Sequence, residues 1–112
     1  MFLLGLGSNL SSSFGNRFEN LNLAISYLEA YNIKILKRSS FYETPSYPNI
    51  KNPKFVNIVV EVSTSLPPED LASVLIFVEE KLERKRKKKN EPRTCDIDII
   101  DYDGKVMNFS YK

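Results

Sequence analysis

Two acidic residues near the end of the chain have the spacing of a metal-binding pair. Asp96 and Asp98 alternate with isoleucines, which is typical of a β-strand. Because strand side chains alternate between faces, both carboxylates should lie on one face, with their Cα atoms roughly 7 Å apart. Carboxylate oxygens so spaced suit Mg²⁺, which also binds water and phosphate oxygens. The alternative is a solvent-facing pair of acids, since this spacing is common.

A run of basic residues precedes this strand. Every residue from 84 to 89 is Lys or Arg, and Arg93 follows. Cations beside a two-carboxylate metal site suit a polyphosphate: the metal lies between carboxylate and phosphate, and the cations bind the remaining oxygens. The alternative is a solvated helix end, where lysines also favour the helix dipole.

Composition limits the classes of protein and chemistry. A chain of 112 residues with 42% apolar and 27% charged residues is typical of one globular domain. The single cysteine, Cys95, allows no intrachain disulfide, and the absence of histidine excludes His-based zinc sites and Ser-His or Cys-His nucleophiles. No apolar run approaches a membrane span of roughly 20 residues, and the first residues lack the basic start of a signal peptide. We therefore expect a cytoplasmic protein.

Hydrophobic periodicity predicts an α+β fold. Alternating or continuous apolar runs predict strands, and the proline-rich stretch 44–53 predicts a binding loop. Helical spacing predicts one helix after Asn16, which could cap it with Glu19 three residues on. It predicts a second helix that Pro67-Pro68 opens, with Glu69 and Asp70 at its positive end. The expected strands cover 2–6, 33–42, 55–64 and the Asp96 segment. This order is that of a ferredoxin-like βαββαβ core, and Asp103-Gly104 predicts an added C-terminal hairpin strand over 105–108.

Four motifs resemble one enzyme family. They are Gly7-Ser8-Asn9, the segments 40–45 and 55–57, and the segment 92–99. In this order and spacing, from Leu4 to about Asn108, the chain resembles the 6-hydroxymethyl-7,8-dihydropterin pyrophosphokinases of folate biosynthesis. The resemblance implies a single domain over 1–112 that uses ATP, a dihydropterin and two Mg²⁺ ions. It implies transfer of pyrophosphate from ATP to the pterin hydroxymethyl group, with release of AMP.

The resemblance also assigns site residues. Those implied to act in catalysis are Arg84, Arg93, Asp96 and Asp98, and the last two are implied to bind metal. The implied ATP-binding residues are Glu79, Arg84, Arg86, Lys87, Arg93 and Ile99. The implied pterin-binding residues are Thr44, Pro45, Phe55, Asn57 and Asp96. The residue types agree, because a flat ring with many donors and acceptors needs an aromatic face and an amide.

The chain departs from the family pattern at several positions. Glu91 replaces a usual glycine, Asn90 replaces a frequent aromatic residue, and Phe55 replaces a frequent tyrosine. The family continues beyond the equivalent of Lys112 with a Pro-His pair, an arginine and a phenylalanine. On this basis we expect the 112-residue chain to bind nucleotide weakly and to turn over slowly or not at all.

Two other functions are compatible with the predicted fold. A ferredoxin-like sheet with a basic run could bind single-stranded RNA, although no RNP-like motif is present and unmetallated Asp96 and Asp98 would repel phosphate. A small interaction module that assembles through a sheet edge would show no dependence on Mg²⁺. The sequence leaves the oligomeric state open, and nucleic acid and membrane are not expected partners.

Overall fold

One of the two inner strands of the sheet is β1 (Phe2–Ser8), which pairs with a strand on each side. The computed structural model describes residues 1–47, 50–85 and 92–104. Its other elements are α1 (Arg17–Ala30), β2 (Lys34–Arg38), β3 (Tyr42–Thr44), β4 (Phe55–Ser63), α2 (Pro68–Lys81) and β5 (Asp96–Tyr102). The strand order is β2-β4-β1-β5, all neighbours are antiparallel, and β3 also pairs with β4. This confirms the predicted ferredoxin-like α+β fold.

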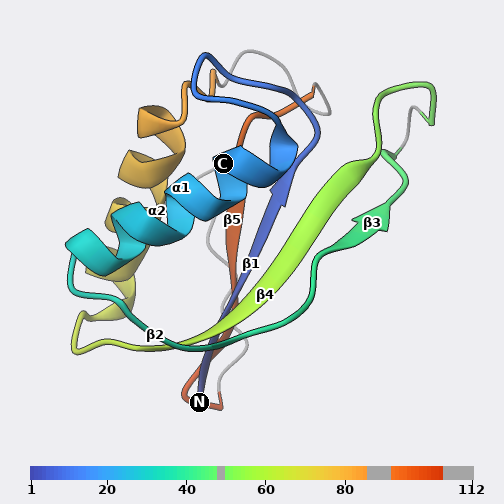
Figure 1. Ribbon diagram of the computed structural model, residues 1–112. Helices are drawn as coiled ribbons and strands as arrows, with labels where there is room; N and C mark the ends of the chain where they lie inside the picture. Colours follow the sequence, from blue (N-terminus) through green and yellow to red (C-terminus); the bar gives the residue numbers. More distant parts are fainter. Residues whose placement is uncertain (48–49, 86–91, 105–112) are drawn as a thin grey trace.

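Both helices pack on one face of this sheet, and no helix or strand of the described residues covers the other face, called the open face below (Figure 1). In β4 the four residues Val56, Ile58, Val60 and Val62 are buried. The residues that alternate with these four, which include Phe55 and Asn57, point to the open face and are only partly buried. The alternation in β4 thus separates a core side from a side on which ligands can bind.

Helix α1 begins at a capping box, as the sequence predicted. The Asn16 side chain accepts a hydrogen bond of 2.9 Å from the Glu19 backbone N–H, and the Glu19 carboxylate accepts one of 2.9 Å from the Asn16 N–H. Leu21, Ile25 and other apolar side chains of the helix are buried against the sheet. The helix is therefore held at its first turn by local hydrogen bonds and along its length by core packing.

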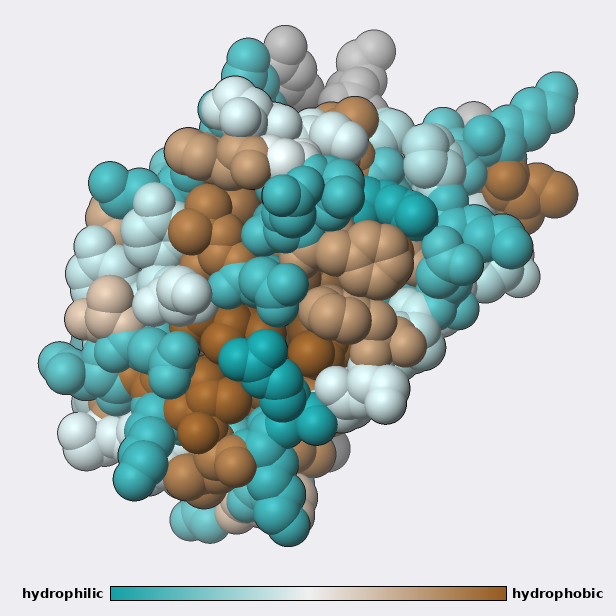
Figure 2. Space-filling view, viewed as in Figure 1, coloured by the Kyte–Doolittle hydropathy of each residue, from teal (hydrophilic) through white to brown (hydrophobic). Residues whose placement is uncertain are grey.

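Helix α2 carries the second apolar stripe of the core. Pro68 opens the helix, and Glu69 and Asp70 lie at its positive end, as predicted. Leu71 and Leu75 are fully buried. On the helix side of the molecule, hydrophobic side chains also reach the surface among hydrophilic ones (Figure 2). Within the described ranges, neither helix is long and apolar enough to cross a membrane.

The prediction of one strand over 33–42 was wrong, because the structure has two strands there. Between them, the Ser39 hydroxyl accepts a hydrogen bond of 2.9 Å from Val59 N–H, and Ser39 N–H donates one of 2.8 Å to the Val59 carbonyl. This serine side chain substitutes for a backbone carbonyl and interrupts the ladder. The short β3 that follows is tied to α1, since Arg17 Nη1 lies 3.3 Å from Glu43 Oε2.

The predicted turn at Asp103-Gly104 is present. Both residues have positive φ, 54° and 84° respectively, as a two-residue hairpin turn requires. The expected hairpin strand over 105–108 lies outside the described residues.

Replacement of the cap residue should weaken α1. Asn16→Ala removes the side-chain acceptor for Glu19 N–H, and we expect the free energy of unfolding to fall by about 1 kcal/mol. Asn22→Ala is the matched control, because Asn22 lies exposed in the middle of the same helix. Denaturant unfolding of both variants measures the difference, and an equal loss in the two would contradict the capping role.

Candidate functional site

The open face of the sheet carries a pocket where β3, β4, β1 and β5 lie side by side. Its volume is about 230 Å³. It is lined by six residues that the sequence predicted for the site: Thr44, Phe55, Asn57, Arg93, Asp96 and Asp98. No site role was predicted for the six other lining residues: Gly5, Leu6, Gly7, Tyr42, Ile58 and Ile100. The fold thus brings together residues that are far apart in the sequence.

The two aspartates lie on the open face of β5, as their spacing predicted. Ile97 and Ile99, which alternate with them, are buried in the core. Across the ladder, Asp96 lies opposite Gly7 and Asp98 lies opposite Gly5. Because the facing residues have no side chains, other side chains can lie close to the backbone of β1 beside the carboxylates, as Ile100 does at Gly5.

A buried ion pair holds Arg84 against the first aspartate. Arg84 Nη1 lies 2.8 Å from Glu79 Oε2 and 2.9 Å from Asp96 Oδ1, and it donates a 3.4 Å hydrogen bond to the Cys95 carbonyl. The same Glu79 oxygen accepts a 2.7 Å hydrogen bond from Ile97 N–H. The Glu79 side chain is 0% exposed and that of Arg84 only 7%. Glu79 therefore joins the end of α2 to the start of β5.

The resemblance implied that Glu79 contacts ATP. Its side chain is fully buried in this structure, and the contact with ATP stays a prediction. What Glu79 does in this arrangement is to position Arg84, which lies beside the aspartate. The Ile99 side chain is 8% exposed and belongs to the core, and the expected contact of Ile99 with ATP stays a prediction.

Asp96 has an arginine close to each of its carboxylate oxygens. Arg84 approaches Oδ1, and Arg93 Nη1 lies 3.6 Å from Oδ2. The described residues contain no group of three or more acidic, histidine or cysteine side chains that could enclose a metal ion. A pair of carboxylates nonetheless fits Mg²⁺, which keeps several waters and shares the phosphate oxygens of its substrate.

Asn9, at the end of β1, connects three parts of the site. It is 1% exposed, and its side-chain nitrogen donates to Ser46 Oγ at 3.3 Å and to the Pro53 carbonyl at 3.2 Å. Its side-chain oxygen accepts a 2.6 Å hydrogen bond from Arg93 N–H, and its own N–H donates to the Arg93 carbonyl at 2.9 Å. Asn9 thus ties the predicted binding loop to the arginine. The sequence placed Asn9 in the Gly7-Ser8-Asn9 motif, but no contact was predicted for its side chain.

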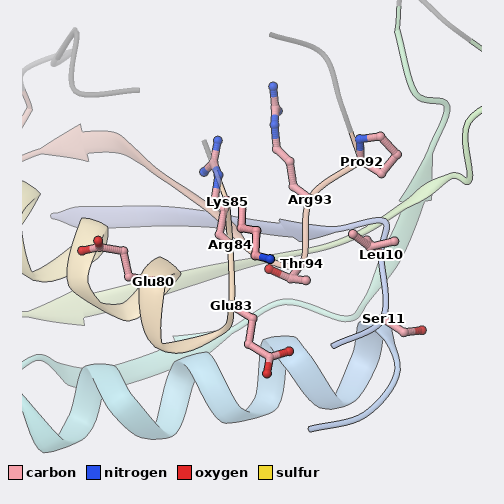
Figure 3. Close-up of a pocket in the computed structure, with 9 residues that line it drawn as sticks. All are labelled: Leu10, Ser11, Glu80, Glu83, Arg84, Lys85, Pro92, Arg93 and Thr94. Atoms are coloured by element: carbon pink, nitrogen blue, oxygen red, sulfur yellow. The ribbon is translucent and has the colours of Figure 1, made fainter. Parts of the chain in front are cut away.

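A second and larger pocket adjoins the first. It has a volume of about 780 Å³ and lies between the end of α2, the loop after β1 and residues 92–94 (Figure 3). Figure 3 shows the side chains of Arg84 and Arg93 extending in the same direction. Arg93 lines both pockets. A ligand in each pocket could therefore contact the same guanidinium group.

The loop after β1 is attached to the end of α2 through Glu83. Ser13 N–H donates a 2.7 Å hydrogen bond to Glu83 Oε1, and the Ser13 hydroxyl donates to Glu83 Oε2. Glu83 has a φ of 69°, in the left-handed region that a non-glycine residue adopts only at some cost. The hydrogen bond from the Ser13 hydroxyl, and then that from its backbone, lower the pKa of Glu83 below its ordinary value of 4.5.

The remaining predicted residues are placed as follows. Pro45 is exposed next to Thr44 and is not among the residues that line either pocket. Arg86 and Lys87 lie outside the described residues, as do Asn90 and Glu91. Their proposed contacts stay predictions.

Comparison with known proteins gives one consistent result. The profile of the family described as 7,8-dihydro-6-hydroxymethylpterin-pyrophosphokinase matches residues 3–110. Two similar proteins are named 2-amino-4-hydroxy-6-hydroxymethyldihydropteridine pyrophosphokinase. The one from Methylorubrum extorquens is 35% identical over 102 residues, and the one from Aquifex aeolicus is 36% identical over 104. The bifunctional protein FolKE of Lactococcus lactis is 42% identical over 105 residues.

The chain spans only part of these relatives. The matches to the Methylorubrum, Aquifex and Lactococcus proteins cover 90%, 93% and 93% of this chain, respectively. They cover only 62%, 62% and 29% of the length of those proteins.

Loss of the buried carboxylate should destabilise the protein. Glu79→Gln leaves the Arg84 guanidinium less compensated in a buried position, and we expect the free energy of unfolding to fall by about 3 kcal/mol. Glu80→Gln, the same change at the exposed neighbour, should change it by less than about 0.5 kcal/mol. Chemical denaturation separates the two, and equal stabilities would show that the Glu79 charge is not needed.

The Glu83 contact should make stability depend on pH. Because folding lowers the pKa of this carboxyl, the contact stabilises the protein fully above the ordinary value of 4.5, and the stabilisation is lost as pH falls through the lowered pKa. Ser13→Ala removes the larger cause and should bring the pKa of Glu83 closer to 4.5. A carboxyl titration by NMR measures both values, and an unchanged pKa in the variant would contradict this assignment.

Proposed function

The chain belongs to the 7,8-dihydro-6-hydroxymethylpterin-pyrophosphokinase family, and we propose on this basis that it transfers pyrophosphate from ATP to 6-hydroxymethyl-7,8-dihydropterin. AMP would be the second product, and the reaction would be a step of folate biosynthesis. One observation carries the proposal beyond the family match. The residues expected to bind a pterin and those expected to bind a metal line the same pocket.

The pterin would lie on the open face of β4. Phe55 offers an aromatic ring there, and Asn57, two residues on, offers a carboxamide on the same side of the strand. A pocket of about 230 Å³ has room for a single bicyclic ring but is too small for a whole nucleotide. The pterin would thereby lie next to Asp96 and Arg93, where the polyphosphate is expected.

The polyphosphate of ATP would lie along β5 and the end of α2. Asp96 and Asp98 would hold Mg²⁺, and two ions are expected with ATP. When bound, the metal would neutralise and polarise phosphate oxygens. Arg93, which is 28% exposed and lines both pockets, would bind negative charge on the transferred group. Arg84 would contribute its charge from a fixed position, because Glu79 and Asp96 hold it.

The reaction needs positioning more than covalent chemistry. The pterin hydroxyl oxygen would attack the β-phosphorus of ATP, the bond from this phosphorus to the oxygen shared with the α-phosphorus would break, and AMP would leave. The hydroxyl proton would pass to solvent. No protein nucleophile is required, which agrees with a sequence that contains no histidine.

The family match favours this function over an RNA-binding or interaction module. Direct metal and nucleotide binding can be measured without turnover.

The first test is binding of α,β-methylene-ATP, an analogue that cannot release AMP. We expect binding by calorimetry that requires Mg²⁺ and that weakens by at least about 10-fold in Asp98→Asn. Asp101→Asn is the control, since its oxygen can still accept the hydrogen bond from Gly104 N–H. Binding that is indifferent to Mg²⁺ and to Asp98 would overturn the proposed metal-polyphosphate site.

A further inference from the structure

Asn57 occupies a position with a neighbouring strand on each side. In the ladder it lies opposite Gly7 of β1 on one side and opposite Tyr42 of β3 on the other. Figure 1 shows β4 lying between β1 and β3. The Asn57 side chain lines the pocket on the open face, so the orientation of its carboxamide decides which group a ligand meets.

The contacts on the β3 side define this orientation. Asn57 Nδ2 donates to Thr44 Oγ1 at 2.9 Å and to the Tyr42 carbonyl at 3.3 Å. A hydroxyl can donate or accept and would fit either orientation, but a backbone carbonyl can only accept. The carboxamide nitrogen must therefore face β3. Its two hydrogens have two acceptors within the protein, and none is left to donate to a ligand.

The contacts on the β1 side show what is presented to the pocket. A Cβ atom placed on Gly7 would lie 3.1 Å from Asn57 Oδ1 and 3.4 Å from Phe55 Cδ1. The carboxamide oxygen thus points toward β1, and the oxygen and the Phe55 ring lie close to the position that a Gly7 side chain would occupy. Gly7 has no left-handed backbone, so the requirement for glycine here is one of space.

We infer that Thr44 is a positioning residue that holds Asn57 as a hydrogen-bond acceptor toward the pocket, and that the site thereby selects the ligand edge that carries N–H donors. The inference rests on the proposed function. A 2-amino-4-oxo pterin offers such an edge through its amino group and the adjacent ring N–H. An edge that carries only acceptors would face the Asn57 oxygen without a hydrogen bond.

The test compares two ligands on three forms of the chain. The ligands are 6-hydroxymethyl-7,8-dihydropterin and its counterpart without the 2-amino group. The unaltered chain should bind the amino ligand at least about 10-fold more tightly, because the counterpart keeps the ring N–H but loses one of the two donors of this edge. Thr44→Val has nearly the same shape but no acceptor for Asn57, so the carboxamide is less restrained. In Thr44→Val the preference for the amino ligand should shrink by about 5-fold or more, while Thr44→Ser should retain it.

A spectroscopic readout separates positioning from loss of structure. In the ligand-free protein, the carboxamide protons of Asn57 should exchange with solvent faster in Thr44→Val than in the unaltered chain, and Thr44→Ser should restore slow exchange. The melting temperature should stay close to that of the unaltered chain, because Thr44 is only partly buried.

The outcomes distinguish the two proposals. If the unaltered chain binds the pterin but Thr44→Val keeps the same preference and the same exchange rate, the positioning role is wrong and the proposed function stands. If the unaltered chain prefers the ligand without the amino group, the assigned orientation is wrong. If it binds neither ligand, the proposed function and this inference both fail.

Discussion

The contact on which the rest of the site depends is the buried pair of Glu79 and Arg84. One carboxylate oxygen of Glu79 meets both the Arg84 guanidinium and the backbone N–H of Ile97. It therefore fixes three things together: the end of α2, the start of β5 and the position of a cation beside Asp96. A buried pair of this kind adds little net stability, but loss of one partner leaves a charge without compensation. It acts as a geometric constraint that the site requires.

The two faces of the sheet carry different kinds of residue, because side chains alternate between the faces along each strand. On one face, aliphatic side chains of β1, β4 and β5 meet the two helices and form the core. On the other face, glycines, an amide, an aromatic ring and two aspartates occupy the intervening positions. The rigid core side therefore holds the ligand side, and a site built on strands keeps its spacing better than one built on loops.

Local patterns in the sequence were sufficient for several features. Alternation placed Asp96 and Asp98 on one face, and the Asn16-x-x-Glu19 spacing located the start of α1, because each depends only on residues a few positions apart. Other features depend on contacts between distant elements. The burial of Glu79 needs β5 to pack against α2, and the break near Ser39 needs a hydroxyl bond to Val59 in another strand. The close approach of Asn57 and Phe55 to Gly7 appears only when β1 lies beside β4. No periodicity in the sequence contains this information.

The pairing of Asp96 with two arginines has a consequence for the order in which charges enter the site. A divalent ion that arrives alone must compete with Arg84 and Arg93 for the carboxylate oxygens of Asp96, and it removes this anion from both arginines, of which Arg84 keeps Glu79. An ion that arrives already bound to a polyphosphate brings the replacement anion with it. The arginines can then exchange a carboxylate for a phosphate while the carboxylate turns to the metal. The protein would in this way discriminate a complexed cation from the free ion by charge exchange, with no selectivity in the aspartates themselves.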